Sequence, residues 1–114
     1  MKILTVCRAG LVRSVSLADV LKLHFKPTDV LPVGKDFNSE ETKQMLFEWA
    51  DKIIVMETHY KDSIPQEYWD KLLVCDVGAD RYGSSKHPEL IDQVFRWVRE
   101  NKQLLGVEEH SLTL

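Results

Sequence analysis

Short apolar runs recur along the chain and predict buried strands. A continuous run of this kind, rich in β-branched residues and bounded by polar segments, is typical of a strand inside a sheet. Pro32 lies in the second run and favours an edge position, because proline cannot donate a backbone hydrogen bond to a neighbouring strand. We predict strands at residues 2–6, 30–33, 52–56 and 72–75.

The segments between these runs carry helical signals. Apolar side chains recur there every three or four positions, as on one face of a helix. Ser39 can cap one helix, and Pro88 suits the first turn of another. The tail from Gly106 onward is expected to be loose. We predict helices at residues 13–25, 39–49, 65–69 and 88–105.

The alternation of strands and helices predicts a parallel sheet with helices on both faces, which is a three-layer α/β sandwich. The length of 114 residues is enough for one hydrophobic core, so we expect a single domain of residues 1–114. A doubly wound sheet of this kind binds ligands at the carboxyl ends of its strands. Residues that directly follow the strands are therefore candidates for a functional site.

Composition narrows the function classes. The formal net charge of −3 argues against a general nucleic-acid binder. No apolar run has the length of a membrane span and no signal peptide is visible, which favours a cytoplasmic protein whose two cysteines are thiols. The four histidines lack the spacing of metal ligands, so we expect no metal and no cofactor. The oligomeric state stays open.

A nucleophile and a cation share the loop after the first predicted strand. From Cys7 to Ser14 this 7–14 loop reads Cys-Arg-Ala-Gly-Leu-Val-Arg-Ser, the pattern CX5RS. Backbone N–H groups of a strand-to-helix loop, together with the positive end of the helix, can hold an oxyanion. Ala9 and Gly10 allow close backbone approach, and Arg13 can bind two phosphate oxygens at once. The same positive field favours the thiolate, the reactive form of Cys7, to which Ser14 can donate a hydrogen bond.

A second loop supplies carboxylates. Hydrolysis of a phosphate ester through a thiolate needs an acid for the leaving oxygen and then a base for water. Asp76 directly follows the fourth predicted strand, and Asp80 lies in the middle of the loop beyond it. Asp80 can reach across the site, whereas Asp76 can instead cap the loop. The residues alone leave both open as the acid.

Three segments carry a family resemblance and occur in the same order over nearly the whole chain, at residues 6–14, 49–56 and 80–83. Together they resemble the low-molecular-weight protein tyrosine phosphatase family. The resemblance implies a four-stranded parallel sheet of strand order 2-1-3-4. It also implies a hydrolase that cleaves phosphate monoesters, above all protein phosphotyrosine, through a phosphocysteine intermediate.

The resemblance further assigns roles to single residues. Cys7 would be the nucleophile, Arg13 would stabilise the transition state, and Asp80 would act as general acid and then as base. Ser14 would support the thiolate, and Tyr82 would line the substrate cleft. The rest of the 7–14 loop would bind the substrate phosphate, at Arg8, Ala9, Gly10, Leu11 and Val12.

Several positions depart from the family pattern, and two of them bear directly on the 7–14 loop. Gly10 stands where an asparagine usually braces the loop, so another group must do so here. Val12 stands where many members have a second cysteine, so no disulfide can form inside the loop.

Other functions are compatible with a cysteine in a phosphate-binding loop. A carrier similar to the IIB components of sugar phosphotransferase systems would hold phosphocysteine without hydrolysing it, but Arg13 and the two aspartates favour a hydrolase. An arsenate reductase needs further cysteines, and Cys75 alone fits poorly. A silent phosphate-binding module is the third alternative.

Overall fold

Four parallel strands form the centre of the molecule. The structure, a computed structural model, describes residues 1–9, 11–26, 29–36 and 39–110. The sheet has the order β3-β1-β4-β5, so the first strand of the chain lies inside it and β3 and β5 form its two edges. Its strands are β1 (Lys2–Cys7), β3 (Asp29–Gly34), β4 (Lys52–Val55) and β5 (Leu72–Val74).

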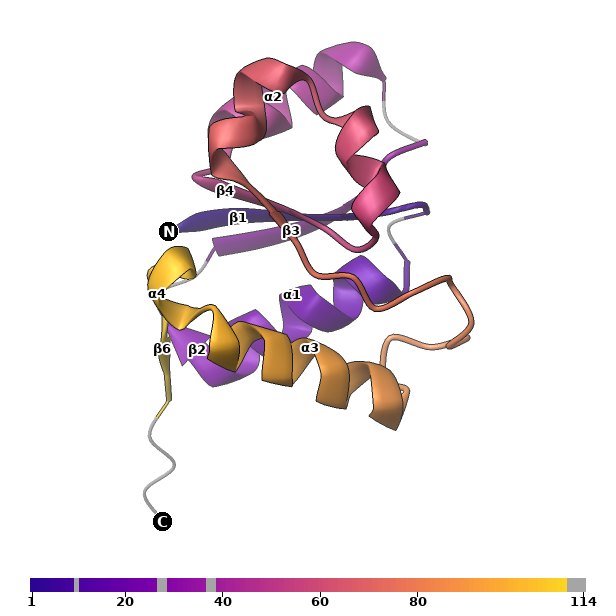
Figure 1. Cartoon of the computed structure of the whole chain (residues 1–114), viewed down its shortest axis with the longest axis vertical. Coiled ribbons are helices and arrows are strands. Elements are labelled where there is room, and N and C mark those ends of the chain that lie inside the picture. Colours follow the sequence, from indigo (N-terminus) through magenta and orange to yellow (C-terminus); the bar gives the residue numbers. More distant parts are fainter. Residues whose placement is uncertain (10, 27–28, 37–38, 111–114) are drawn as a thin grey trace.

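Helices cover both faces of this sheet, as Figure 1 shows, which confirms the predicted α/β layering. One face packs against α1 (Arg13–His24) and α3 (Pro88–Glu100). The other packs against α2 (Glu40–Trp49) and two short 3-10 helices, η1 (Thr58–Ser63) and η2 (Gln66–Lys71).

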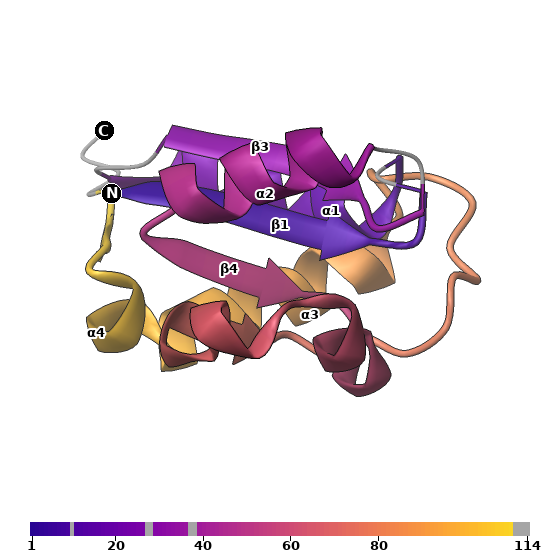
Figure 2. The same ribbon diagram turned by 90° about the horizontal axis from the view of Figure 1, so that it is seen from above.

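The two hydrophobic cores meet at β1, because successive side chains of a strand point to opposite faces. Ile3 and Cys7 belong to the core beneath α1 and α3, and Leu4 and Val6 belong to the core beneath α2. Viewed from above, β1 and β4 run side by side in the same direction (Figure 2). Their carboxyl ends therefore deliver the following loops to one end of the molecule.

The expected strand order of 2-1-3-4 is not confirmed, because the strands of the main sheet carry other numbers, in the order β3-β1-β4-β5. The chain forms an extra strand, β2 (Phe25–Lys26), directly after α1 and before the edge strand β3. β2 lies outside the main sheet and pairs antiparallel with β6 (Glu108–Glu109). Phe25 is buried against Phe95 of α3, which holds this short ribbon over the helices.

The last helix is shorter than predicted, and part of the tail is ordered. α3 ends at Glu100, and a separate helix, α4 (Lys102–Leu105), follows it. Gly106 then takes a left-handed backbone with φ of 66°, which glycine adopts readily and which ends the helix. Beyond it, β6 pairs with β2, so the expectation of a loose tail is wrong for residues 106–110 and lies outside the described residues for 111–114.

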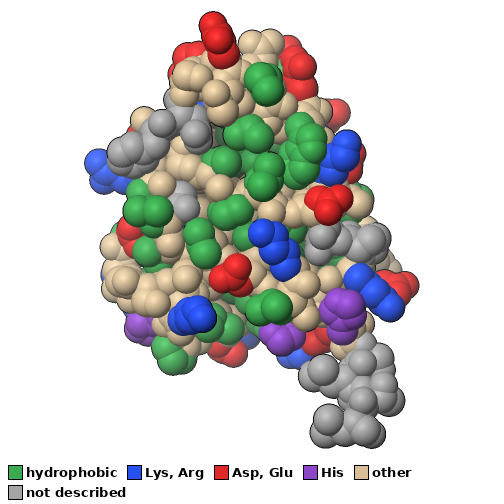
Figure 3. Space-filling model, turned by 180° about the vertical axis from the view of Figure 1, so that it is seen from behind, with side chains coloured by type: hydrophobic (Ala, Val, Ile, Leu, Met, Phe, Trp, Pro, Cys, Tyr) green, Lys and Arg blue, Asp and Glu red, His purple; other side chains and the backbone are tan. Residues whose placement is uncertain are grey.

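Apolar side chains also reach the surface. The rear of the molecule, where the edge strand β3 lies, shows hydrophobic side chains grouped between charged ones (Figure 3). Large exposed examples are Leu31 of β3 and Met45 of α2. Within the described residues, no helix combines the length and apolarity that crossing a membrane requires.

Candidate active site

Loops from three strands meet at the carboxyl edge of the sheet. Cys7 ends β1, Glu57 follows the end of β4, and Asp76 follows the end of β5. In Figure 1 these loops lie on the right of the sheet, together with the long loop that leads to α3. Among the described residues no group of histidine, cysteine and carboxylate side chains is arranged to hold a metal.

The beginning of the 7–14 loop packs tightly against the end of β3. The Lys35 backbone N–H donates to the Cys7 carbonyl at 2.9 Å. A Cβ at Gly34 would lie 2.6 Å from the carbonyl carbon of Ala9, so only glycine lets the loop approach this closely. Gly34 thus braces the loop and was missed in the sequence, because the contact joins segments that are far apart in the chain. Gly10 lies outside the described residues.

The candidate nucleophile is held beside a hydroxyl. Cys7 is only 2% exposed, and a hydrogen bond of 3.1 Å joins its Sγ to Ser14 Oγ. Ser14 is itself fixed, since Thr5 Oγ1 donates to its carbonyl at 2.8 Å. Neither Cys7 nor Cys75 forms a disulfide. The geometry allows Ser14 to donate to a thiolate at Cys7, as expected.

Arg13 is buried and anchored by a set of groups that we call the inner network. Its guanidinium is 1% exposed. Nη1 donates to Glu57 Oε2 at 2.6 Å and to the Gly78 carbonyl at 2.8 Å, and Nη2 donates to Tyr60 Oη at 2.9 Å. Nε is also buried but has no hydrogen-bond partner among the described residues. A buried N–H without a partner is costly, so this donor is suited to an oxyanion of a ligand.

The inner network keeps both members of its ion pair charged. Burial works against the charge of Arg13, but hydrogen bonds to Glu57 and Tyr60 outweigh it and raise the arginine pKa. Burial likewise works against ionised Glu57, yet the hydrogen bond from Arg13 prevails and the pKa of this carboxyl is lowered. Burial, followed by a hydrogen bond to Glu57, raises the pKa of Tyr60.

Sequence reasoning missed Glu57, Tyr60 and Gly78. Glu57 carried a usable signal, because it directly follows the central apolar run and hence lies at the same sheet edge as Cys7. Tyr60 and Gly78 enter the site only through the conformations of η1 and of the loop after β5. Neither position has a local pattern that would reveal this.

The N-terminus of α1 is also open to an anion. Val12 occupies the N-cap position and provides no side-chain cap, and the first turn contains no acidic residue. The positive end of the helix dipole therefore faces the 7–14 loop without a counter-charge from its own first turn.

The two candidate acids differ in their surroundings. Asp76 Oδ2 accepts from the backbone N–H of Thr58 at 3.0 Å and from its hydroxyl at 2.7 Å, while Oδ1 accepts from Gly78 N–H at 2.9 Å. Hydrogen bonds from the Thr58 side chain and backbone lower the pKa of Asp76. Asp80 is exposed, and within the described residues no hydrogen bond or ion pair occupies its carboxylate. Asp76 is thus a loop-bracing residue, and Asp80 has the freedom an acid needs.

Tyr82 is a core residue in this structure. Its ring is buried beneath α3, and its hydroxyl donates to the Val77 carbonyl at 2.6 Å. Gln93 Nε2 donates to the same hydroxyl at 3.1 Å. Arg81 lies over the ring and is paired with Glu89. A role for Tyr82 in lining a substrate cleft stays a prediction.

The remaining side chains of the 7–14 loop lie at different depths. The Arg8 side chain is 73% exposed, and Leu11 is 71% exposed. Ala9 is half-buried against Gly34, and Val12 packs on the core beneath α1 and α3. Side chains at such different depths cannot all contact one ligand, whereas the backbone N–H groups of the loop can. This agrees with a loop that binds an anion through N–H groups.

Comparisons with known proteins reveal a likeness of fold. No protein-family model and no curated protein matches the sequence. The YwlE arginine phosphatase from Geobacillus stearothermophilus superposes with a TM-score of 0.59 at 19% identity, over 90% of this chain and 95% of that one. Wzb from Vibrio vulnificus, in complex with benzylphosphonate, gives 0.57 at 17% identity, over 87% and 97%. A YwlE mutant with a phosphorylated active-site serine gives 0.56 at 15% identity, over 91% and 99%. The chain therefore has the fold of the low-molecular-weight protein tyrosine phosphatases, as its sequence motifs indicate.

Proposed function

We propose that this protein is a cysteine-dependent phosphatase that hydrolyses phosphate monoesters, with protein phosphotyrosine as its main substrate. One observation carries the proposal. Arg13 lies in the same loop as Cys7, is buried and anchored on Glu57, Tyr60 and Gly78, and its Nε has no hydrogen-bond partner within the described residues. A fixed cation with a spare donor beside a thiol is the arrangement that phosphoryl transfer needs. The phosphatase fold supports the proposal, and so does the benzylphosphonate in the Wzb complex.

The first chemical step forms a covalent intermediate. The thiolate of Cys7 attacks phosphorus, the S–P bond forms, and the bond from phosphorus to the leaving oxygen breaks. Asp80, in its protonated form, gives its proton to that oxygen. Arg13 and the backbone N–H groups at the start of α1 stabilise the negative charge on the phosphoryl oxygens.

The second step releases phosphate. The Asp80 carboxylate takes a proton from water, and the oxygen of that water attacks phosphorus. The S–P bond breaks and the electron pair returns to Cys7, whose thiolate Ser14 stabilises by donating a hydrogen bond across the 3.1 Å separation. The products are inorganic phosphate and the restored enzyme, with Asp80 again protonated.

Phosphoarginine is a second candidate substrate. Two of the compared structures are of an arginine phosphatase. In addition, the hydroxyls of Tyr82 and Tyr60 are engaged inside the protein, and both rings are buried. These two tyrosines thus offer no exposed ring face on which an aryl group could stack.

The decisive experiment uses purified protein with an aryl phosphate, a phosphotyrosine peptide and a phosphoarginine peptide. We expect release of inorganic phosphate and no turnover by Cys7→Ser. An active Cys7→Ser variant would overturn the proposal. Stable phosphocysteine without phosphate release would favour the carrier function instead. The relative rates on the two peptides decide between the candidate substrates.

A further inference from the structure

The two sides of the candidate site differ in charge. Because β3 and β5 form opposite edges of the sheet, the residues after them flank Cys7 from opposite directions. On the β5 side the exposed carboxylate of Asp80 faces solvent, and the cation nearest to it in sequence, Arg81, is held by both oxygens of Glu89 at 3.1 and 2.7 Å. The guanidinium of Arg81 is therefore already paired with a carboxylate.

The β3 side is basic. Lys35 Nζ donates to Asp36 Oδ1 at 2.8 Å, and Arg8 Nε lies 3.7 Å from Asp36 Oδ2. Lys43 lies close enough to lower the pKa of Asp36, after larger contributions from Lys35 and Arg8, and is paired with Glu40 at 3.2 Å. We call Arg8, Lys35, Asp36 and Lys43 the basic rim. With Glu40 included, three cations face two carboxylates, although the whole chain has a net charge of −3.

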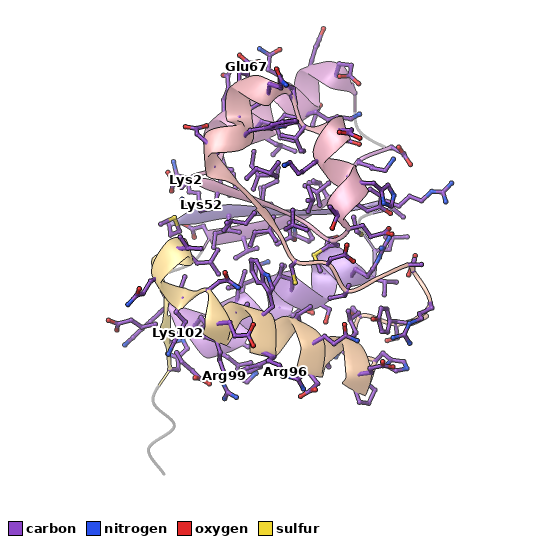
Figure 4. The ribbon with its side chains drawn as sticks, in the orientation of Figure 1. Lys2, Lys52, Glu67, Arg96, Arg99 and Lys102 are labelled. Carbon is purple, nitrogen blue, oxygen red and sulfur yellow. The ribbon has the colours of Figure 1, made fainter. Side chains whose placement is uncertain are left out.

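The basic rim lies next to the candidate nucleophile. The Lys35 backbone N–H donates to the Cys7 carbonyl, and Arg8 is the residue after Cys7. The Lys35 ammonium also lies 5.2 Å from the centre of the Tyr60 ring, which belongs to the inner network. Other lysines, such as Lys2 and Lys52 at the left of Figure 4, lie at the amino ends of β1 and β4, the opposite end of the sheet.

We infer that the basic rim binds a carboxylate of the substrate, so that the enzyme prefers phosphorylated residues with a neighbouring Asp or Glu. The inference rests on the proposed phosphatase function. Lys35 and Arg8 share a single carboxylate, that of Asp36. The contact of Arg8 is long and exposed, so the two cations can together bind a second carboxylate.

The test compares two phosphopeptides that differ only in Glu or Gln beside the phosphorylated residue. The readout is the ratio of their kcat/KM values. We expect the Glu peptide to be favoured about two- to fivefold, which is what one exposed ion pair supplies. The preference should shrink as salt is added, because exposed charges are screened.

Three variants locate the effect. Lys35→Gln should lower the ratio towards one, whereas Asp36→Asn should raise it, because it removes the competing carboxylate. Lys22→Gln is the matched control, since it removes one exposed lysine from the last turn of α1, at the end away from the 7–14 loop, and should leave the ratio unchanged. The opposite signs of the two rim variants exclude a general loss of folding as the cause.

The outcomes separate the two proposals. If wild-type protein hydrolyses neither an aryl phosphate nor either peptide, the proposed function fails and the inference with it. If it hydrolyses both peptides at equal efficiency, the inference alone is overturned. The inference is also overturned if Lys22→Gln changes the ratio as much as Lys35→Gln, because the effect would then come from overall charge.

Discussion

Two arginines of the same loop have opposite surroundings. Arg13 is buried, and its Nη atoms donate hydrogen bonds of 2.6, 2.8 and 2.9 Å to Glu57, Gly78 and Tyr60. Arg8, five positions earlier, has a side chain that is 73% exposed, and its ion pair with Asp36 is 3.7 Å long. The inner network therefore fixes the Arg13 cation in one position, whereas Arg8 of the basic rim is held loosely.

This difference separates two tasks. A transition state needs charge that does not move, because reorganisation during the reaction costs free energy. Recognition of varied neighbouring residues tolerates movement and gains little from each exposed pair. We therefore expect changes in the inner site to affect turnover and stability strongly, and changes in the basic rim to affect only the choice of substrate.

The largest expected effect is on turnover and concerns the acid. Asp80→Asn should lower kcat on a substrate with a poor leaving group about 10²- to 10⁴-fold, because the leaving oxygen is no longer protonated. Asp76→Asn should cost much less, since Asp76 braces Thr58 and Gly78. Steady-state kinetics of both variants check this. A larger loss in Asp76→Asn would reverse the two roles.

The next effect is on stability. Glu57→Ala leaves Arg13 buried without its carboxylate, so the free energy of unfolding should fall by about 3 kcal/mol, the low end for breaking a buried ion pair. Urea unfolding of wild type and variant measures the difference. A loss below about 1 kcal/mol, the level of an exposed pair, would show that the inner network is no stronger than the basic rim.

The same ion pair makes stability depend on pH. The pKa of Glu57 is lower in the folded protein than its ordinary value of 4.5, so the folded state favours the ionised carboxyl. Its contribution to the free energy of unfolding should be complete above pH 4.5 and should be lost as the pH falls through the lowered pKa of the folded state. Unfolding of wild type and Glu57→Gln at neutral and acidic pH tests this. The difference in free energy of unfolding between wild type and Glu57→Gln should become smaller only at acidic pH.

A smaller effect is expected where the loop meets β3. Gly34→Ala would place a Cβ 2.6 Å from Ala9 C and 2.7 Å from Ala9 O, both of them backbone atoms that cannot rotate away. Overpacking of this kind costs about 1–3 kcal/mol. It should also weaken inhibition by inorganic phosphate, because the loop shifts. Normal phosphate affinity in a destabilised variant would mean that Gly34 supports the fold only.

The smallest effect belongs to the basic rim. Arg8→Ala should change the free energy of unfolding by less than about 0.5 kcal/mol, as for most exposed side chains. The measurement is the same urea unfolding that is applied to Glu57→Ala. A loss comparable to that of Glu57→Ala would remove the distinction between the two regions.

Local signals in the sequence were sufficient for most elements of the fold. The apolar runs marked all four strands of the main sheet, and Ser39 caps α2 as predicted by accepting from Thr42 N–H at 3.2 Å. β2 and β6 were missed because each is a two-residue strand whose partner lies more than eighty positions away. η1 was missed because its sequence has no apolar periodicity, only a single buried side chain, Tyr60.

The candidate site likewise contains residues that local sequence signals predict and residues that only the folded chain reveals. The sequence predicted Cys7, Ser14 and Arg13 as site residues because they share one loop at a strand end. The structure brings Cys7 and Ser14 into contact. The partners of Arg13 could not be predicted from the sequence, since they depend on how η1 and the loop after β5 fold back over the sheet. The burial of Tyr82 was not foreseeable either, because it follows from packing beneath α3.

The position of Cys75 has a consequence for oxidation. Cys7 is the last residue of β1, and Cys75 directly follows β5. β4 lies between these strands, and at its end Met56 N–H donates to the Val6 carbonyl while Cys75 N–H donates to the Val55 carbonyl. Two strand spacings amount to about 9–10 Å, too far for a disulfide, which needs Cα atoms within about 7 Å. With Val12 in the loop, peroxide that reaches Cys7 meets no second thiol of this chain to trap the sulfenic acid. Further oxidation to the sulfinic acid is irreversible for most proteins, so protection must come from an external thiol.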